Sequence, residues 1–100
     1  MVYSVIFTPS ALRDLVEAKT FYALVNSNLG KYCTDSLMLD AEKLAFFAGI
    51  HSKKFGYYRM VTRNFPFSIY YKISGQQVLV SAFIDNRKKP KDTLNKLMSL

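Results

Sequence analysis

The sequence has one cysteine, one histidine and no tryptophan. Cys33 alone can form no internal disulfide, and it excludes a zinc site built from several cysteines. No apolar run approaches the ~18 residues of a membrane span. The first ten residues lack the basic region and long apolar core of a secretory signal. We therefore predict a cytoplasmic protein with a reduced thiol, no cofactor, no bound metal and no membrane partner.

Acidic residues are also scarce, with 7 Asp and Glu against 14 Lys and Arg and a net charge of +7. Residues 1–50 hold four basic and five acidic residues, whereas residues 51–100 hold ten and two. A strongly basic half predicts an anionic partner, either a nucleic acid or an acidic protein segment. The alternative is that the charge serves solubility alone.

Apolar residues make up 50% of the chain and aromatic residues 15%. This composition excludes a disordered tail, which would need low hydrophobicity and high charge. One hundred residues suffice for a single hydrophobic core. There are no internal repeats or linkers, so residues 1–100 are predicted to form one domain.

The first half of the chain reads as a strand followed by two helices. Residues 2–7 are rich in β-branched and aromatic side chains, which favours a strand. Thr8 is a plausible N-cap and Pro9 suits the first turn of a helix over residues 9–26. The predicted apolar stripe of this helix is Leu12, Leu15, Val16, Tyr22 and Val25. A turn at residues 26–30 leads to a second helix over roughly 30–48. Its predicted buried face is Cys33, Leu37, Ala41, Leu44 and Ala48.

The second half changes to the period of a sheet. A polar loop at residues 49–54 precedes three predicted strands, at residues 56–63, 67–73 and 78–84. Pro66 lies in the first connection, and residues 74–77 form a tight hairpin turn. Residues 91–99 predict a short terminal helix with Leu94, Leu97 and Met98 on its apolar side. The fold class is therefore α+β, in the order β-α-α-β-β-β, with a helical hairpin on one face of an antiparallel sheet.

Two segments of the second half resemble a known family. The first, residues 58–73, is YRMVTRNFPFSIYYKI, an arginine-bearing strand with a Phe-Pro-aromatic turn into an Ile-Tyr-Tyr strand. The second, residues 78–90, is VLVSAFIDNRKKP, an apolar strand that ends in Arg-x-x-Pro. In this order, after PSALRDL at residues 9–15 and NLGK at residues 28–31, they resemble the ParE/RelE superfamily of type II toxin–antitoxin systems. Plasmid stabilisation proteins belong to the same group.

This resemblance implies a bacterial toxin that a cognate, acidic antitoxin neutralises. ParE-like members inhibit DNA gyrase by binding, whereas RelE-like members cut mRNA on the ribosome. A third possibility is an inactive member that only binds an antitoxin. The residues expected to bind a partner are Arg59, Arg63, Arg87, Lys88 and Lys89.

The nuclease alternative needs a phosphate clamp and a proton donor and acceptor. Arg59, Arg63 and Arg87 could clamp phosphate bidentately, and Lys53 and Lys54 lie just before the first arginine strand. Arg59 and Arg63 are four residues apart, so we expect them on one strand face. The stretch after Arg87 has no Tyr or His where RelE-like members carry one, which favours the ParE-like interpretation. His51 is expected to be an exposed loop residue rather than a catalytic one, and Cys33 a core residue.

Overall fold

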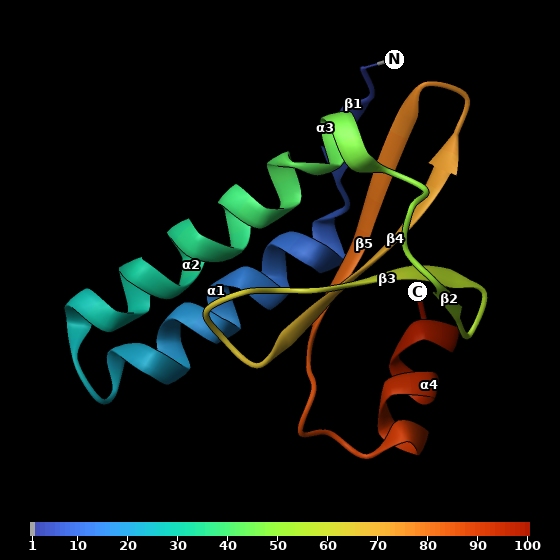
Figure 1. Ribbon diagram of the computed structural model, residues 1–100. Coiled ribbons are helices and arrows are strands. Elements are labelled where there is room, and N and C mark those ends of the chain that lie inside the picture. The colour runs from blue at the N-terminus through green and yellow to red at the C-terminus, as the bar shows by residue number, and fades with distance from the viewer. Residues whose placement is uncertain (1) are drawn as a thin grey trace.

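A computed structural model describes residues 2–100. It shows a five-stranded sheet with a helical hairpin on one face and a short helix on the other (Figure 1). The helices are α1 (Pro9–Ala23), α2 (Ser27–Glu42), α3 (Leu44–Phe47) and α4 (Pro90–Met98). The strands are β1 (Ser4–Phe7), β2 (Lys53–Lys54), β3 (Tyr57–Val61), β4 (Phe67–Ser74) and β5 (Gln77–Asp85). The predicted α+β class and the order of its main elements are confirmed.

The sheet has the order β1-β5-β4-β3-β2, so the first and last strands lie side by side. β2, β3, β4 and β5 pair antiparallel, but β1 pairs parallel with β5. The expectation of a wholly antiparallel sheet is thus wrong for β1. The helical hairpin carries the chain back to the end of the sheet where it began. β3, β4 and β5 then alternate in direction, and β5 ends up running the same way as β1. β5 is apolar on both faces because the helical hairpin covers one face of the sheet and α4 covers part of the other.

The helix α1 begins as predicted but buries a different face. The Thr8 hydroxyl oxygen accepts the Ala11 N–H at 3.1 Å, and Pro9 occupies the first turn. Of the predicted stripe, Leu15 is buried, whereas Leu12, Val16 and Val25 are exposed. The face toward the sheet is instead Ala11, Asp14, Leu15 and Ala18. The small alanines let α1 lie close to the sheet, and a hydropathy pattern gives small residues too little weight to find this face.

The buried face of α2 is close to the prediction. Cys33, Leu37, Ala41 and Leu44 are all 0% exposed, and Ala48 packs at the edge of the core. The helix begins at Ser27 rather than near residue 30, because the Asn26 side chain accepts the Asn28 N–H at 2.8 Å. The predicted helix over 30–48 is divided at Lys43 into α2 and α3.

A bulge in β5 divides its side chains between the two faces of the sheet. Tyr70 pairs with Ala82 and Tyr71 with Val80, so Ser81 has no partner in β4. The extra residue reverses the alternation along β5. As a result Val78, Val80 and Phe83 pack under the helical hairpin, whereas Ala82 and Ile84 pack on the opposite face.

The opposite face of the sheet is covered in part by α4. Leu97 packs there against Tyr70, Ala82 and Ile84, with Tyr57 at the margin. Thr93 is buried beside Leu97, but Met98, which was expected on the apolar side, is 75% exposed. The helical hairpin lies on one face of the sheet as predicted, and α4 covers part of the other face, because the strands present large apolar side chains on both faces.

The carboxylate of Asp14, which is 5% exposed, joins α1 to both other layers. Its Oδ2 accepts the Phe83 N–H at 3.0 Å, and its Oδ1 accepts the Lys96 ammonium at 2.6 Å. β1 pairs only with residues 77–80 of β5, so beyond the bulge the edge of β5 has no strand beside it. Asp14 fills this gap by accepting the N–H that a strand would otherwise bind.

We expect Asp14→Ala to destabilise the protein by about 2–4 kcal/mol, because it leaves a buried N–H and a half-buried ammonium without their acceptor. Chemical denaturation followed by circular dichroism measures this difference. Glu17→Ala, an exposed change on the same helix, is the matched control and should shift stability by less than about 0.5 kcal/mol. Equal effects of the two changes would contradict the assigned role of Asp14.

A second prediction concerns the crossing of α1 and α2 at Gly30. A Cβ on Gly30 would lie 2.6 Å from the Lys19 carbonyl oxygen and 3.0 Å from the Ala23 Cβ. Gly30→Ala should therefore destabilise the protein by about 1–3 kcal/mol, although alanine favours helices more than glycine does. Thermal melts would measure the loss, with Asn28→Ala on the exposed side of the same turn as control. A stabilised Gly30→Ala protein would contradict this packing.

Candidate functional site

Arg59 lies on β3, on the face of the sheet that α4 partly covers. Its cross-strand neighbour in β4 is Tyr70. The Arg59 Nη2 donates to the Asn86 Oδ1 at 3.1 Å, and the Ser68 hydroxyl donates to the same oxygen. Asn86 therefore holds the guanidinium in place from just beyond β5. The Arg59 Nε is buried and has no hydrogen-bond partner within residues 2–100.

Arg59 lines a small hollow of about 160 Å³, which we call the basic pocket. Its lining residues are Lys54, Arg59, Tyr70, Asp85, Asn86, Lys88, Pro90 and Thr93. Three of them are cations that come from β2, β3 and the loop before α4. The single carboxylate is already bound by Arg87. A pocket with this charge and size fits a phosphate or a carboxylate group, since both accept hydrogen bonds from Arg and Lys.

Lys53 and Lys54 reach the site through a tight hairpin. They form β2 and pair with Tyr58 and Tyr57 of β3. The two turn residues, Phe55 and Gly56, have positive φ values of 56° and 83°. Two such residues match the twist of a two-residue hairpin. Lys54 lines the basic pocket, whereas the Lys53 ammonium lies 5.0 Å from the centre of the Tyr58 ring.

A broader hollow of about 540 Å³ adjoins the basic pocket and shares Lys54 and Arg59 with it. His51 and Lys53 also line this hollow. His51 is half-buried rather than an exposed loop residue, because its Nδ1 hydrogen-bonds to the buried hydroxyl of Tyr71. Burial lowers the pKa of His51 from its usual 6.5, which favours the neutral ring. No local pattern indicates this contact in advance, since residues 51 and 71 meet only through the fold.

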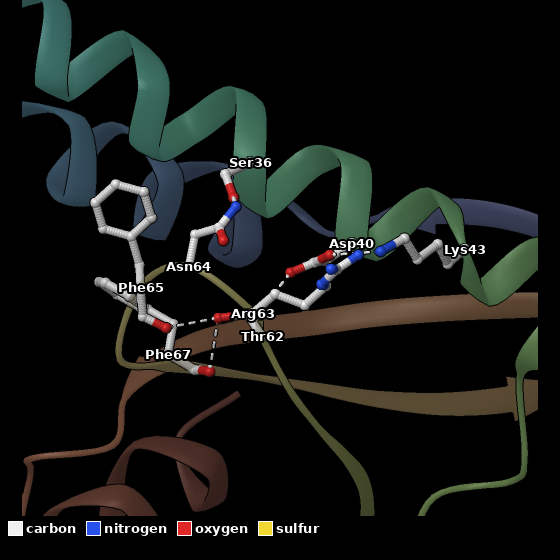
Figure 2. Close-up of polar contacts among 8 residues, drawn as sticks. All are labelled: Ser36, Asp40, Lys43, Thr62, Arg63, Asn64, Phe65 and Phe67. Atoms are coloured by element: carbon white, nitrogen blue, oxygen red, sulfur yellow. Dashed lines mark hydrogen bonds and ion pairs between the residues drawn. The ribbon is translucent and has the colours of Figure 1, made fainter.

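Arg63 lies beside α2 (Figure 2) and lines a different hollow from Arg59. β3 ends at Val61, so the spacing of four residues does not put Arg59 and Arg63 on one strand face, and that expectation is wrong. The chain turns here because the Thr62 hydroxyl lies 2.9 Å from the carbonyl oxygens of both Phe65 and Phe67. The Arg63 N–H donates to the Asp40 Oδ2 at 3.0 Å, which draws this loop against α2.

Arg87 is held by Asp85 and takes no part in lining the basic pocket. The Arg87 backbone N–H, Nε and Nη2 all donate to the Asp85 carboxylate, at 2.6–3.2 Å. The side-chain hydrogen bond from Arg87 holds the pKa of Asp85 below its usual 3.8. Of the residues proposed from the sequence, the pocket thus brings together Lys54, Arg59 and Lys88. It does not include Lys53, Arg63, Arg87 or Lys89.

The described residues give less support to a cysteine nucleophile, a metal site or a membrane-spanning helix. Cys33 is fully buried, and burial raises its pKa to about 11, so it is a core residue as predicted. Within residues 2–100, no three His, Cys, Asp or Glu side chains gather closely enough to hold a metal ion. None of the described helices is long and apolar enough to cross a membrane.

In sequence, the chain matches no family model and no curated protein. In structure, it is similar to a solved chain described as "Chromosomal ParDE TA system from P. aeruginosa". The two have a TM-score of 0.77 and 17% sequence identity, and the match covers 84% of this chain and 96% of that chain. This likeness establishes the fold, which is the ParE-like arrangement that the motifs at residues 58–73 and 78–90 predicted.

The ion pair between Asp85 and Arg87 gives a prediction about pH. Because the pKa of Asp85 is depressed in the folded protein, the pair stabilises the fold above pH 3.8 and this contribution is lost as pH falls through the depressed value. Arg87→Ala should raise the Asp85 pKa toward 3.8, and carboxyl NMR titration measures it directly. Lys89→Ala is the control. An unchanged Asp85 pKa in Arg87→Ala would refute the proposed cause.

Proposed function

We propose that this chain is the toxin of a type II toxin–antitoxin pair and acts by binding a protein target, with DNA gyrase as the first candidate. The fold shared with a ParDE system chain supports a toxin, and the dispersed arginines support binding over cleavage. Arg59, Arg63 and Arg87 point to three different places, so they form no joint clamp around a scissile phosphate. Neither His nor Cys lines the basic pocket. The dispersal of the arginines is the observation on which the choice rests.

The antitoxin is proposed to be a separate acidic protein. Ten of the fourteen basic residues lie in the second half of the chain, which forms the strands and loops around the basic pocket. An acidic segment laid over this surface would neutralise its charge and block access to the pocket. An inactive member of the family would bind the antitoxin in the same way, but it would not affect growth.

One observation favours the RelE-like alternative, a ribosome-dependent mRNA endonuclease. His51, Lys53, Lys54 and Arg59 line the same hollow beside the basic pocket. A neutral imidazole can accept a proton, and the three cations could stabilise charge on phosphorus. In that case His51 would take the place of the Tyr or His that is missing after Arg87.

Two assays on the purified protein separate these functions. Under the proposal, the protein inhibits supercoiling of relaxed plasmid by gyrase and leaves a translated mRNA intact in primer extension. Cuts that require ribosomes and disappear in His51→Ala would replace the proposal with the nuclease alternative. Normal supercoiling, intact mRNA and normal growth upon expression would contradict a toxin altogether.

The basic pocket itself can be tested by growth arrest upon induction in bacteria. We expect Arg59→Ala to abolish the arrest. Lys54→Ala should lower the affinity for the target about tenfold or more and so weaken the arrest, since a hydrogen bond to a charged group contributes about 1.5–3 kcal/mol. Lys91→Ala changes the net charge equally, lies outside the pocket lining and serves as the control. Circular dichroism checks that each variant is folded. Loss of arrest in Lys91→Ala to the same degree would mean that only net charge matters.

A further inference from the structure

The outer face of α2 and α3 carries a row of exposed apolar side chains. Tyr32, Leu39 and Phe46 are spaced by seven residues and are 54%, 62% and 67% exposed. Seven residues are close to two helical turns, so Tyr32 and Leu39 follow one line along α2. Phe46 of α3 lines the same groove beyond the break at Lys43. Tyr32 and Leu39 point away from the buried face formed by Cys33, Leu37 and Ala41. We call these three residues the outer stripe.

The outer stripe borders a continuous hollow rather than a convex surface. Its three residues line one groove of about 580 Å³, whose far wall is the loop at Arg63 and Asn64. Figure 2 shows this loop beside α2, with Asp40 and Lys43 between them. Single exposed apolar residues are common on proteins, but a groove lined by several of them marks an interaction surface.

The charges beside the outer stripe indicate what would cover it. Asp35 lies four residues before Leu39, and Lys43 lies four residues after it. If a second copy of α2 lies antiparallel across Leu39, each residue meets the one equally far on the other side of Leu39. Asp35 then faces Lys43 of the second copy, and Tyr32 faces Phe46 of the second copy. Both pairings occur twice, as two-fold symmetry requires.

We propose that the outer stripe is the interface of a homodimer, in which α2 and α3 of two copies pack antiparallel and at a shallow angle about Leu39. We propose a second copy as the occupant because the order of charges along the outer stripe is complementary to itself. An unrelated helix would have no reason to match this order. α2 lies at the periphery of the fold (Figure 1), and the loop at Arg63 and Asn64 borders the groove on one side.

The charged side chains are available for these contacts. Asp35 pairs with Lys31 on its own helix, but both are more than half exposed, and such a surface pair contributes little. Lys43 is bound to Asp40 at 3.1 Å and is still 41% exposed. Asp35 can therefore reach across the interface freely. The Lys43 ammonium has three N–H donors, so it can bind Asp35 of the second copy while it keeps its contact with the buried Asp40 carboxylate.

Sedimentation equilibrium of the purified wild-type chain tests the proposal first. We expect a reversible dimer, and Leu39→Glu should raise its dissociation constant about a hundredfold, because two apolar contacts are lost and two like charges meet at the axis. Leu39 is largely exposed, so this variant should fold normally by circular dichroism. Val16→Glu, an equally exposed site on α1, is the control and should leave the dimer unchanged.

A charge exchange tests the antiparallel arrangement itself. Asp35→Lys and Lys43→Glu should each dimerise at least about tenfold more weakly than the wild type, because each puts like charges face to face. An equimolar mixture of the two variants should recover dimers. In the mixed dimer the lysine introduced in the first variant meets the glutamate introduced in the second, and the unchanged Lys43 meets the unchanged Asp35. Recovery on mixing supports the proposed geometry, and its absence would overturn it.

A wild-type chain that stays monomeric at about 0.2 mM would also overturn the proposal, since a dimer with a dissociation constant of about 10 μM or less would be mostly formed at that concentration. In that case the outer stripe is left for another protein, and the antitoxin is the first to test. A monomer that gains stability from an antitoxin, and loses it in Leu39→Glu, would establish this other occupant. The dimer does not depend on the toxin function, so the two proposals succeed or fail separately.

Discussion

The carboxylate of Asp14 ties together parts of the chain that are far apart in sequence. It accepts an N–H from β5 and an ammonium from α4 while it lies on α1, so one buried side chain connects all three layers. It can do this because β1 is short and leaves the second half of β5 without a neighbouring strand. The bulge at Ser81 falls two residues before Phe83, so Asp14 binds β5 and α4 close to the point where the side chains of β5 change faces.

A second buried carboxylate does the same for α2. Asp40 accepts the Arg63 N–H, and nearby the Asn64 amide donates to the Ser36 hydroxyl at 2.9 Å. Each helix of the hairpin therefore has a buried carboxylate that accepts a backbone N–H, from strand β5 in the case of Asp14 and from the loop between β3 and β4 in the case of Asp40. The contact at Asp40 directs the chain after β3 toward the helices, which separates Arg63 from Arg59 and leaves the basic pocket with the other cations.

The molecule as a result has two surfaces of different character. The basic pocket and the hollow beside it lie at the sheet, where lysines and an arginine converge from elements of the second half of the chain. The outer stripe lies on the hairpin, in the half of the chain whose net charge is close to zero. A charged surface suits an anionic partner, whereas an apolar stripe with alternating charges suits a copy of itself.

The sequence alone determined the α+β class, the succession of helices and strands, the buried face of α2 and the basic character of the second half. These follow from local periodicity, capping and composition, which act over a few residues. Only the tertiary structure decided that β1 runs parallel to β5, that α4 covers the second face, and that Arg59 meets Lys54 and Lys88 but not Arg63 or Arg87. Each of these depends on where a strand ends or where a bulge falls, and contacts between residues far apart in the chain set those points.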